Sequence, residues 1–189
     1  MSQTIVHRDP EPRRRLWPSL VVILALLSWG CQAQEPPLSP AAALFKKEIK
    51  ECLNRLATAL IQPVAAGNPA AILAALDKVE PETIKLCRMC PFITAVLNQQ
   101  GDILATHPPR PHTTRNFADY NLVIKTISSK QIQQQRFYLQ NGQQLYIISA
   151  PLLQEDRVMG IIAIAISAQE AKNRWDVSEK EFMALDFNT

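Results

Sequence analysis

The chain has 189 residues, of which 47% are hydrophobic and 20% are charged, and its formal net charge is +3. These values are typical of a folded globular protein of one domain, and they exclude a wholly disordered chain. Only 5 glycines are present, and they are scattered along the sequence. A phosphate-binding loop needs clustered glycines, so P-loop and dinucleotide-binding proteins are excluded.

Residues 1–30 have the pattern of a secretory signal peptide. Arginines at positions 13–15 precede an almost wholly apolar run over 16–29, and Gly30 comes before Cys31. Cys31 lies where a bacterial lipoprotein carries its lipidated cysteine, which predicts a signal peptide of lipoprotein type. The alternative is an uncleaved anchor, although the apolar run is short for a transmembrane helix. This segment holds four arginines and two acidic residues, so the remaining chain has a net charge of only +1. It lacks the basic cluster that nucleic-acid binding requires.

Residues 31–40 contain three prolines and are expected to form an extended tether. Helices are predicted over the next segment, 41–90. In the first, 41–61, apolar residues recur at helical spacing and define one buried stripe. The stripe consists of Phe45, Ile49, Cys52, Leu53, Leu56 and Leu60. Pro63 is expected to end this helix, a second helix is predicted over 69–79, and a short third one from Pro81 to just before Pro91.

Residues 91–168 change to the period of a β-sheet. Segments 92–97 and 103–107 are predicted to form a hairpin, and 119–127 a short helix with Asp119 as a candidate N-cap. Segments 131–140 and 143–150 flank Asn141-Gly142, which indicates a type I′ hairpin turn. Pro151 is expected to end the second of these strands. Segment 158–167 is apolar on both faces, which predicts a central strand.

Residues 169–189 are predicted to form a C-terminal helical tail, in which Ser178 and Glu181 make a capping box. Taken together, the elements predict an α+β fold in a single domain. Its centre is a five-stranded antiparallel sheet packed against the N-terminal helices.

Three segments of the C-terminal half carry a family resemblance: TAVLNQQGDILATHP, FYLQNGQQLYIISAPLL and EDRVMGIIAIAIS. In this order, after a long N-terminal helix, they resemble the extracytoplasmic Cache sensor domains, the PAS-like modules of bacterial chemoreceptors and histidine kinases. The resemblance covers residues 41–167. It implies a sensor that binds a small molecule between the sheet and the segment 108–130.

Members of that family that bind amino acids surround the ligand with Tyr, Arg and Trp side chains. The residues that match here are Tyr120, Arg136, Tyr138 and Tyr146. Period 2 places Arg136 and Tyr138 on one face of their strand. The aspartate that holds an amine in the family has no counterpart in the expected later strand. No kinase or methyl-accepting segment follows, so we expect a separate receptor or kinase to take the signal, and the long first helix to allow a homodimer.

Cys87 and Cys90 form a CxxC pair, and Cys52 is a third thiol beyond the lipidated one. Pro91 stands where covalent haem attachment would need a histidine. A disulfide of Cys52 with either cysteine, or a local pair, is one interpretation of these thiols. The alternative function for the whole chain is a periplasmic thiol-redox or metal-binding protein that uses Cys52, Cys87 and Cys90.

No Ser/His/Asp order or carboxylate pair stands out, so we expect neither an enzyme nor a bound cofactor. The expected location is a membrane surface facing the periplasm, reached through the lipid anchor. Gln32 after the lipidated cysteine slightly favours the outer membrane. The hypothesis from sequence is therefore a membrane-anchored, Cache-like lipoprotein that binds a small molecule and signals through a partner.

Overall fold

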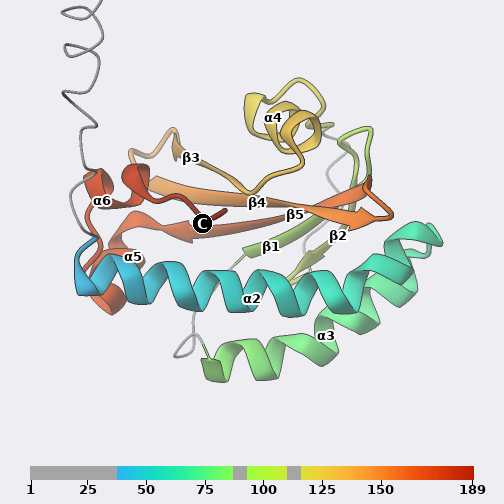
Figure 1. The fold of residues 1–189 in the computed structure, drawn as a ribbon, viewed down its shortest axis with the longest axis horizontal. Helices are drawn as coiled ribbons and strands as arrows, with labels where there is room; N and C mark the ends of the chain where they lie inside the picture. Colours follow the sequence, from blue (N-terminus) through green and yellow to red (C-terminus); the bar gives the residue numbers. More distant parts are fainter. Residues whose placement is uncertain (1–37, 87–92, 110–115) are drawn as a thin grey trace, which may run out of the picture. The chain divides into compact units, whose positions relative to one another are not determined.

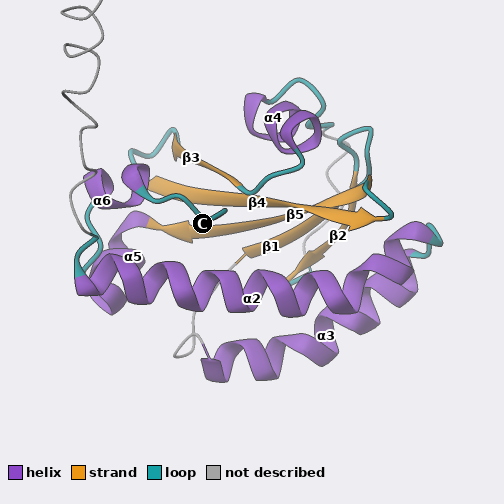
Figure 2. Ribbon diagram, in the orientation of Figure 1, coloured by secondary structure: helices purple, strands orange, loops and turns teal. Residues whose placement is uncertain are grey.

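A mixed helix-and-sheet domain occupies the part of the chain that the computed structural model describes, residues 38–86, 93–109 and 116–189. Residues 80–86 are described by their backbone alone. The elements follow the order α2, α3, β1, β2, α4, β3, β4, β5, α5, α6 (Figures 1 and 2). None of the helices within the described ranges has the length and hydropathy needed to cross a membrane.

The sheet has the strand order β2-β1-β5-β4-β3, and every pairing is antiparallel. The strands are β1 (Ile93–Leu97), β2 (Ile103–His107), β3 (Gln133–Tyr138), β4 (Gln144–Gln154) and β5 (Arg157–Ser167). The last strand therefore lies at the centre, as its apolar sequence predicts. This confirms the predicted α+β fold with one five-stranded antiparallel sheet.

Helices cover both faces of the sheet (Figure 1). The long helix α2 (Pro40–Ala65) runs across one face and contacts β4 and β5, and α3 (Pro69–Leu86) packs beside it and contacts β2. The short helix α4 (Asn121–Ser129) lies on the other face, over β3, β4 and β5. The sheet thus separates a helical layer, formed by α2 and α3, from a smaller cover, which consists of α4 and the residues 116–120 that lead into it.

The main core lies between α2 and the sheet. The predicted stripe of α2 is buried as expected, and it meets the side chains that β4 and β5 direct to this face. Those strand residues are Tyr146, Ile148, Leu152, Ile162, Ile164 and Ile166. Gly160 lets α2 come close, because a Cβ there would lie 2.6 Å from the carbonyl oxygen of Leu97 and 2.7 Å from Val64 Cγ1.

Two helix boundaries were predicted wrongly, in both cases at a proline. Helix α2 continues through Pro63 to Ala65, and α3 runs unbroken through position 81 to Leu86, so that two helices replace the predicted three. A proline has a helical φ and removes one backbone donor, so packing of the rest of the helix can outweigh its cost. Helix α4 begins at Asn121 with Tyr120 as its N-cap residue, which corrects the Asp119 assignment.

The strand ends near turns also differ from the prediction. Asn141-Gly142 joins β3 to β4, but only Gly142 has a positive φ, so the turn is not type I′. Consecutive positive φ angles occur instead at Glu155 and Asp156, between β4 and β5. Strand β4 continues through Pro151, because β3 pairs with β4 only as far as Ser149 and the proline therefore lies where one edge of β4 is unpaired.

The C-terminal residues complete the core and are not a separate tail. They form α5 (Ala168–Trp175), which lies in the segment predicted to be helical, and α6 (Glu179–Ala184) with the predicted capping box. The rings of Trp175, Phe182 and Phe187 surround Phe45 of α2 at centroid distances of 5.2, 6.4 and 6.5 Å. Aromatic edge-to-face contacts of this kind add to the apolar area that they bury.

The carboxylate of Glu181 joins the first described helix to the last. It accepts hydrogen bonds from the backbone N–H and the hydroxyl of Ser178, which caps α6, and from the hydroxyl of Ser39, which caps α2. The Ser178 and Ser39 hydroxyls and the Ser178 N–H lower the pKa of Glu181 from 4.5 to about 2. This group therefore stabilises the fold above its ordinary pKa, and the contribution is lost as the pH falls toward 2.

The substitution Glu181→Gln tests this link. We expect the free energy of unfolding at pH 7 to fall by about 1 kcal/mol, the usual cost of weakening a helix cap. The difference from the unsubstituted chain should shrink between pH 5 and pH 2, because the carboxylate itself becomes protonated there. Urea unfolding at several pH values measures both effects, and Glu155→Gln in the exposed β4–β5 turn is the control. A difference that persists at the lowest pH would contradict the assignment.

Candidate functional site

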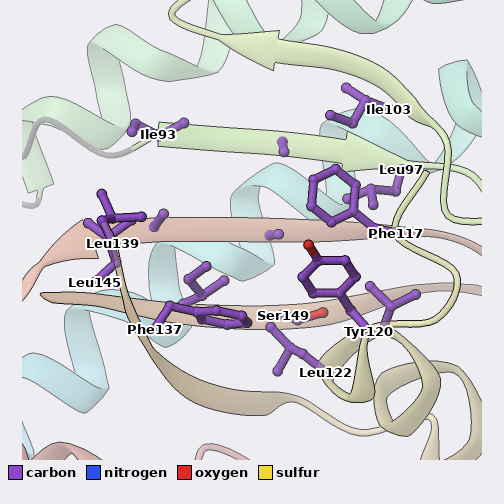
Figure 3. Close-up of a pocket in the computed structure, with 15 residues that line it drawn as sticks. Ile93, Leu97, Ile103, Phe117, Tyr120, Leu122, Phe137, Leu139, Leu145 and Ser149 are labelled. Atoms are coloured by element: carbon purple, nitrogen blue, oxygen red, sulfur yellow. The ribbon is translucent and has the colours of Figure 1, made fainter. Parts of the chain in front are cut away.

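A cavity of about 290 Å³ lies on the side of the sheet that faces α4. Its walls come from β1, β3, β4, β5, the first residue of β2 and the segment that leads into α4 (Figure 3). This volume lies just below the range of roughly 300–1,000 Å³ that is typical of ligand pockets, so the cavity suits a compact small molecule. It lies in the place that the sequence resemblance implies, between the sheet and the segment 108–130.

The floor of the cavity includes small side chains on β1 and β5, two paired inner strands of the sheet. Ala95 of β1 pairs with Ala163 of β5, and Ala165 follows two residues further on the same face. The intervening residues of β5, Ile162, Ile164 and Ile166, point to the opposite face and fill the main core. Over Ile162–Ile166, strand β5 therefore places bulky side chains against α2 and methyl groups on the α4 face, which leaves space for the cavity beside Ile161, a residue that packs against Val123.

Aromatic rings form the other wall. Figure 3 shows Phe117 and Tyr120 on the segment before α4, and Phe137 on β3, around the same space. The centroids of Phe117 and Tyr120 are 5.0 Å apart, and those of Tyr120 and Phe137 are 6.4 Å apart. Leu122 and Val123 add the first turn of α4 to this wall.

The segment that carries Phe117 and Tyr120 is attached to the β1–β2 hairpin. The side-chain amide of Asn116 donates to an Asp102 carboxylate oxygen at 2.6 Å and to the carbonyl oxygen of Gln100 at 2.8 Å. The backbone N–H of Phe117 donates to the carbonyl oxygen of Gly101 at 2.8 Å. Hydrogen bonds from Asn98 and Asn116 lower the pKa of Asp102. The aromatic wall is thus oriented by the hairpin turn.

The far end of α4 has its own attachment to the sheet. Lys130, at the C-cap of α4, forms an ion pair of 2.5 Å with Asp156 in the β4–β5 turn. Both side chains are well exposed, so this pair contributes little to stability and orients α4 rather than holding it in place. The cover of the cavity is therefore attached at both ends by polar contacts that can break and re-form.

One buried polar pair joins α4 to the floor. The hydroxyls of Thr126 and Ser149 lie 2.9 Å apart, and the Thr126 hydroxyl also lies 2.8 Å from the carbonyl oxygen of Leu122. Both residues are almost completely buried, and Ser149 borders the cavity. A buried hydroxyl without a partner is costly, so this pair fixes how α4 sits on β4.

The structure does not bring the four predicted ligand-binding residues together. Tyr120 lines the cavity, whereas Arg136, Tyr138 and Tyr146 lie on the opposite face of the sheet. Register explains the separation: Arg136 pairs with Tyr146, whose ring lies in the main core, and their neighbours Phe137 and Leu145 line the cavity. Arg136 and Tyr138 do share one face, as period 2 predicts.

Arg136 is occupied by contacts outside the cavity. Its guanidinium forms an ion pair with Glu179 at the start of α6 and lies 4.9 Å from the centroid of the Tyr138 ring. Tyr138 itself is 63% exposed. These contacts join β3 to the C-terminal helix rather than to the cavity.

Tyr146 is a core residue. It is 2% exposed, and its ring is stacked on Phe182 of α6 with centroids 4.1 Å apart. Burial raises the pKa of Tyr146, and the nearby charge of Arg136 acts in the opposite direction. Its surroundings are those of a packing residue between β4 and α6.

Of the predicted cysteine sites, only Cys52 falls within the described residues, where it is fully buried on α2. Cys31, Cys87 and Cys90 lie outside them, so the lipidation, disulfide and redox predictions are not tested by the structure. In the described ranges, no three residues among His, Cys, Asp and Glu come close enough to hold a metal ion.

The floor of the cavity was missed in the sequence, although a signal was present. In the run Ile162–Ile166, isoleucine alternates with alanine, and the central position of this strand was predicted. A central strand with large residues on one face and methyl groups on the other leaves space on the second face unless a neighbour fills it. The aromatic residues Phe117 and Phe137 were missed. The face on which Phe137 lies depends on the register of β3, and the position of Phe117 depends on the path of a loop.

Comparison with known proteins identifies the fold. No protein-family model and no curated protein matches the chain. Among solved structures, it is similar to the ligand-binding domain of the Pseudomonas aeruginosa amino acid chemoreceptor PctC in complex with GABA. The TM-score is 0.55 at 13% identity, over 73% of this chain and 64% of that one. It is also similar to the sensor domain of the Vibrio cholerae histidine kinase DctB, with a TM-score of 0.45 at 16% identity, over 70% of this chain and 60% of that one.

The fold assignment rests on the first of these two likenesses. The described domain has the PAS-like fold of extracytoplasmic Cache sensor domains, with N-terminal helices on one face of a five-stranded sheet. This confirms the fold expected from the sequence resemblance. The chain spans slightly under two thirds of the chemoreceptor domain. At this identity, the likeness concerns the fold and not the ligand.

The polar pair under α4 gives a direct test of how the cover is attached. Thr126→Val leaves the Ser149 hydroxyl buried without this partner, so we expect the free energy of unfolding to fall by about 1–3 kcal/mol. Removing both hydroxyls, in Thr126→Val with Ser149→Ala, should cost less than the sum of the two single changes. Chemical denaturation of the four proteins completes a double-mutant cycle. Strictly additive losses would show that the two hydroxyls do not interact.

Proposed function

We propose that this protein is a small-molecule sensor whose ligand occupies the cavity between the sheet and α4, in contact with Tyr120. The observation that carries the proposal is the cavity itself, which is walled by elements from across the sheet and bounded by a cover attached at both ends. The domain contains a cavity and has the fold of a chemoreceptor ligand-binding domain, and the two observations together support a receptor role. Tyr120 is retained from the sequence prediction.

Ligand binding would change how the cover rests on the sheet. The Asn116–Asp102 and Lys130–Asp156 contacts at its two ends are exposed, and the aromatic wall lies between them. A ligand that contacts both the alanine floor and the aromatic wall favours the arrangement in which they are closer, and so shifts a two-state equilibrium. Because β5 has α2 on its other face, the same shift can reach α2 and a partner protein beyond it.

The proposal includes export and anchoring. The basic and apolar segment before Cys31 supports a lipoprotein signal, and lipidation of that cysteine would tether the sensor domain to a membrane surface facing the periplasm. A tethered domain of this kind would act on a membrane receptor or kinase. Pairing of two copies through α2 is the form that we propose for the oligomer.

The cavity is tested by filling it. Ala163→Leu places a larger side chain on the floor, so we expect the purified chain to lose the stabilisation that a cavity ligand gives. Thermal unfolding of the unsubstituted chain against a panel of amino acids, carboxylates, purines and neutral aromatic compounds should show at least one compound that raises the midpoint. Ala74→Leu, the same change at an exposed position of α3, is the matched control and should keep the response.

Two results would contradict the proposed site. The first is a panel in which no compound raises the unfolding midpoint. The second is a compound that stabilises Ala163→Leu as strongly as it stabilises the unsubstituted chain, because its binding site then lies elsewhere.

The anchor is tested by Cys31→Ser. We expect this change to abolish incorporation of labelled palmitate, because the lipid is attached through a thioether to the cysteine sulfur and serine has no thiol. Labelling in a bacterial host measures this. A chain that incorporates no label even with Cys31 present would favour the uncleaved anchor instead.

A further inference from the structure

We infer that the cavity selects an uncharged ring compound with one hydrogen-bonding group, and rejects the zwitterionic amino acid that carries the same ring. This inference rests on the proposed function and specifies the ligand class of the same site. It is carried by the chemistry of the lining, by the position of the Tyr120 hydroxyl and by the shape of the space.

The lining contributed by the described residues is almost entirely hydrocarbon. Its fifteen residues are alanine, valine, leucine, isoleucine and phenylalanine apart from Tyr120 and Ser149, and none is charged. An ammonium or carboxylate group that enters such a space loses its hydration and gains no opposite charge from these walls. Burying that charge opposes binding, whereas burying a neutral ring favours it.

Arg136, which the family resemblance matched to a ligand-binding position, does not change this preference for a neutral ring over a charged group. It lies on the other face of the sheet, in an ion pair with Glu179. On the strands that form the floor, the side chains that line the cavity are those of Ala95, Ala163 and Ala165 together with larger hydrocarbon residues and Ser149. The features that would hold an amino acid backbone are therefore missing from the described walls.

Two hydroxyls provide the polar chemistry that the described lining offers. The Ser149 hydroxyl is already hydrogen-bonded to Thr126. The Tyr120 hydroxyl points toward the sheet, beside the ring of Phe117 (Figure 3). A phenolic hydroxyl both donates and accepts, so it suits an N–H or O–H group on the rim of a ring.

The shape of the space favours a flat molecule. The methyl groups of Ala95, Ala163 and Ala165 leave a low area in the sheet surface, and the rings of Phe117, Tyr120 and Phe137 line the same cavity. A planar ring between these surfaces gains offset-stacked or edge contacts with the aromatic wall. A volume of about 290 Å³ suits one or two fused rings rather than a long chain.

Matched pairs of compounds test the inference, because the two members of each pair share a ring and only the amino acid carries the charged groups. Indole is compared with L-tryptophan, and 4-methylphenol with L-tyrosine, by isothermal titration of the purified full chain. We expect each neutral compound to bind at least tenfold more tightly than its amino acid. Ala163→Leu should abolish the binding of both neutral compounds, and Ala74→Leu should leave it intact.

The role of Tyr120 has its own comparison. Tyr120→Phe should weaken indole about fivefold, the order expected for one lost neutral hydrogen bond, and should leave 1-methylindole unchanged because that compound has no N–H to donate. Thermal unfolding of the Tyr120→Phe protein verifies that it is folded. Equal losses for indole and 1-methylindole would overturn the hydrogen-bonding role.

The remaining outcomes separate the inference from the proposed function. If an amino acid binds as tightly as its neutral partner or more tightly, and Ala163→Leu abolishes that binding, the ligand class is overturned and the sensor site stands. If the neutral compounds bind Ala163→Leu as well as the unsubstituted chain, the cavity is not the site and both fail. If neither neutral compound binds at millimolar concentration, the inference is overturned, and the proposed function is then judged on the panel of other compounds.

Discussion

The unequal faces of β5 are the constraint on which the rest of the structure depends. Isoleucines at alternate positions fill the space under α2, and the alanines between them leave space under α4. Exchanging the two sets would remove the main core and the cavity together. Burial of the isoleucine face forms the larger of the two buried clusters, so the alanines on the other face can leave space beside the smaller cluster of Leu97, Val123 and Ile161.

The C-terminal residues make the helical face tight enough for this arrangement. Phe45 of α2 is enclosed by Trp175, Phe182 and Phe187, and Glu181 hydrogen-bonds to the N-cap of α2. The cover on the other face is attached by exposed polar contacts at its ends, by one buried hydroxyl pair and by a small apolar cluster of Leu97, Val123 and Ile161. This contrast between a large core on one face and a small cluster on the other suits a domain in which a ligand moves the cover and the helical layer transmits the change.

Periodicity predicted most of the fold, because burial stripes are local patterns. The stripe of α2, the first hairpin, the central position of β5 and the Ser178–Glu181 capping box all follow from spacing and residue type. Proline and turn geometry were less predictable. Pro63, position 81 and Pro151 continue their elements because neighbouring contacts decide whether one lost hydrogen bond is tolerated.

The candidate site was predicted only in its location and in Tyr120. The facing of Arg136 and Tyr146 depends on the register of β3 with β4, which no local pattern reveals.

The central claim is that a ligand sits on the alanine floor, and methyl NMR of alanine-labelled protein tests it most directly. On titration with indole, we expect the methyl signals of Ala95, Ala163 and Ala165 to shift with one common binding curve. The signals of Ala74 on α3 and Ala171 on α5 should stay in place. Shifts confined to the helical residues, or unchanged floor methyl signals in the presence of bound indole, would contradict the account.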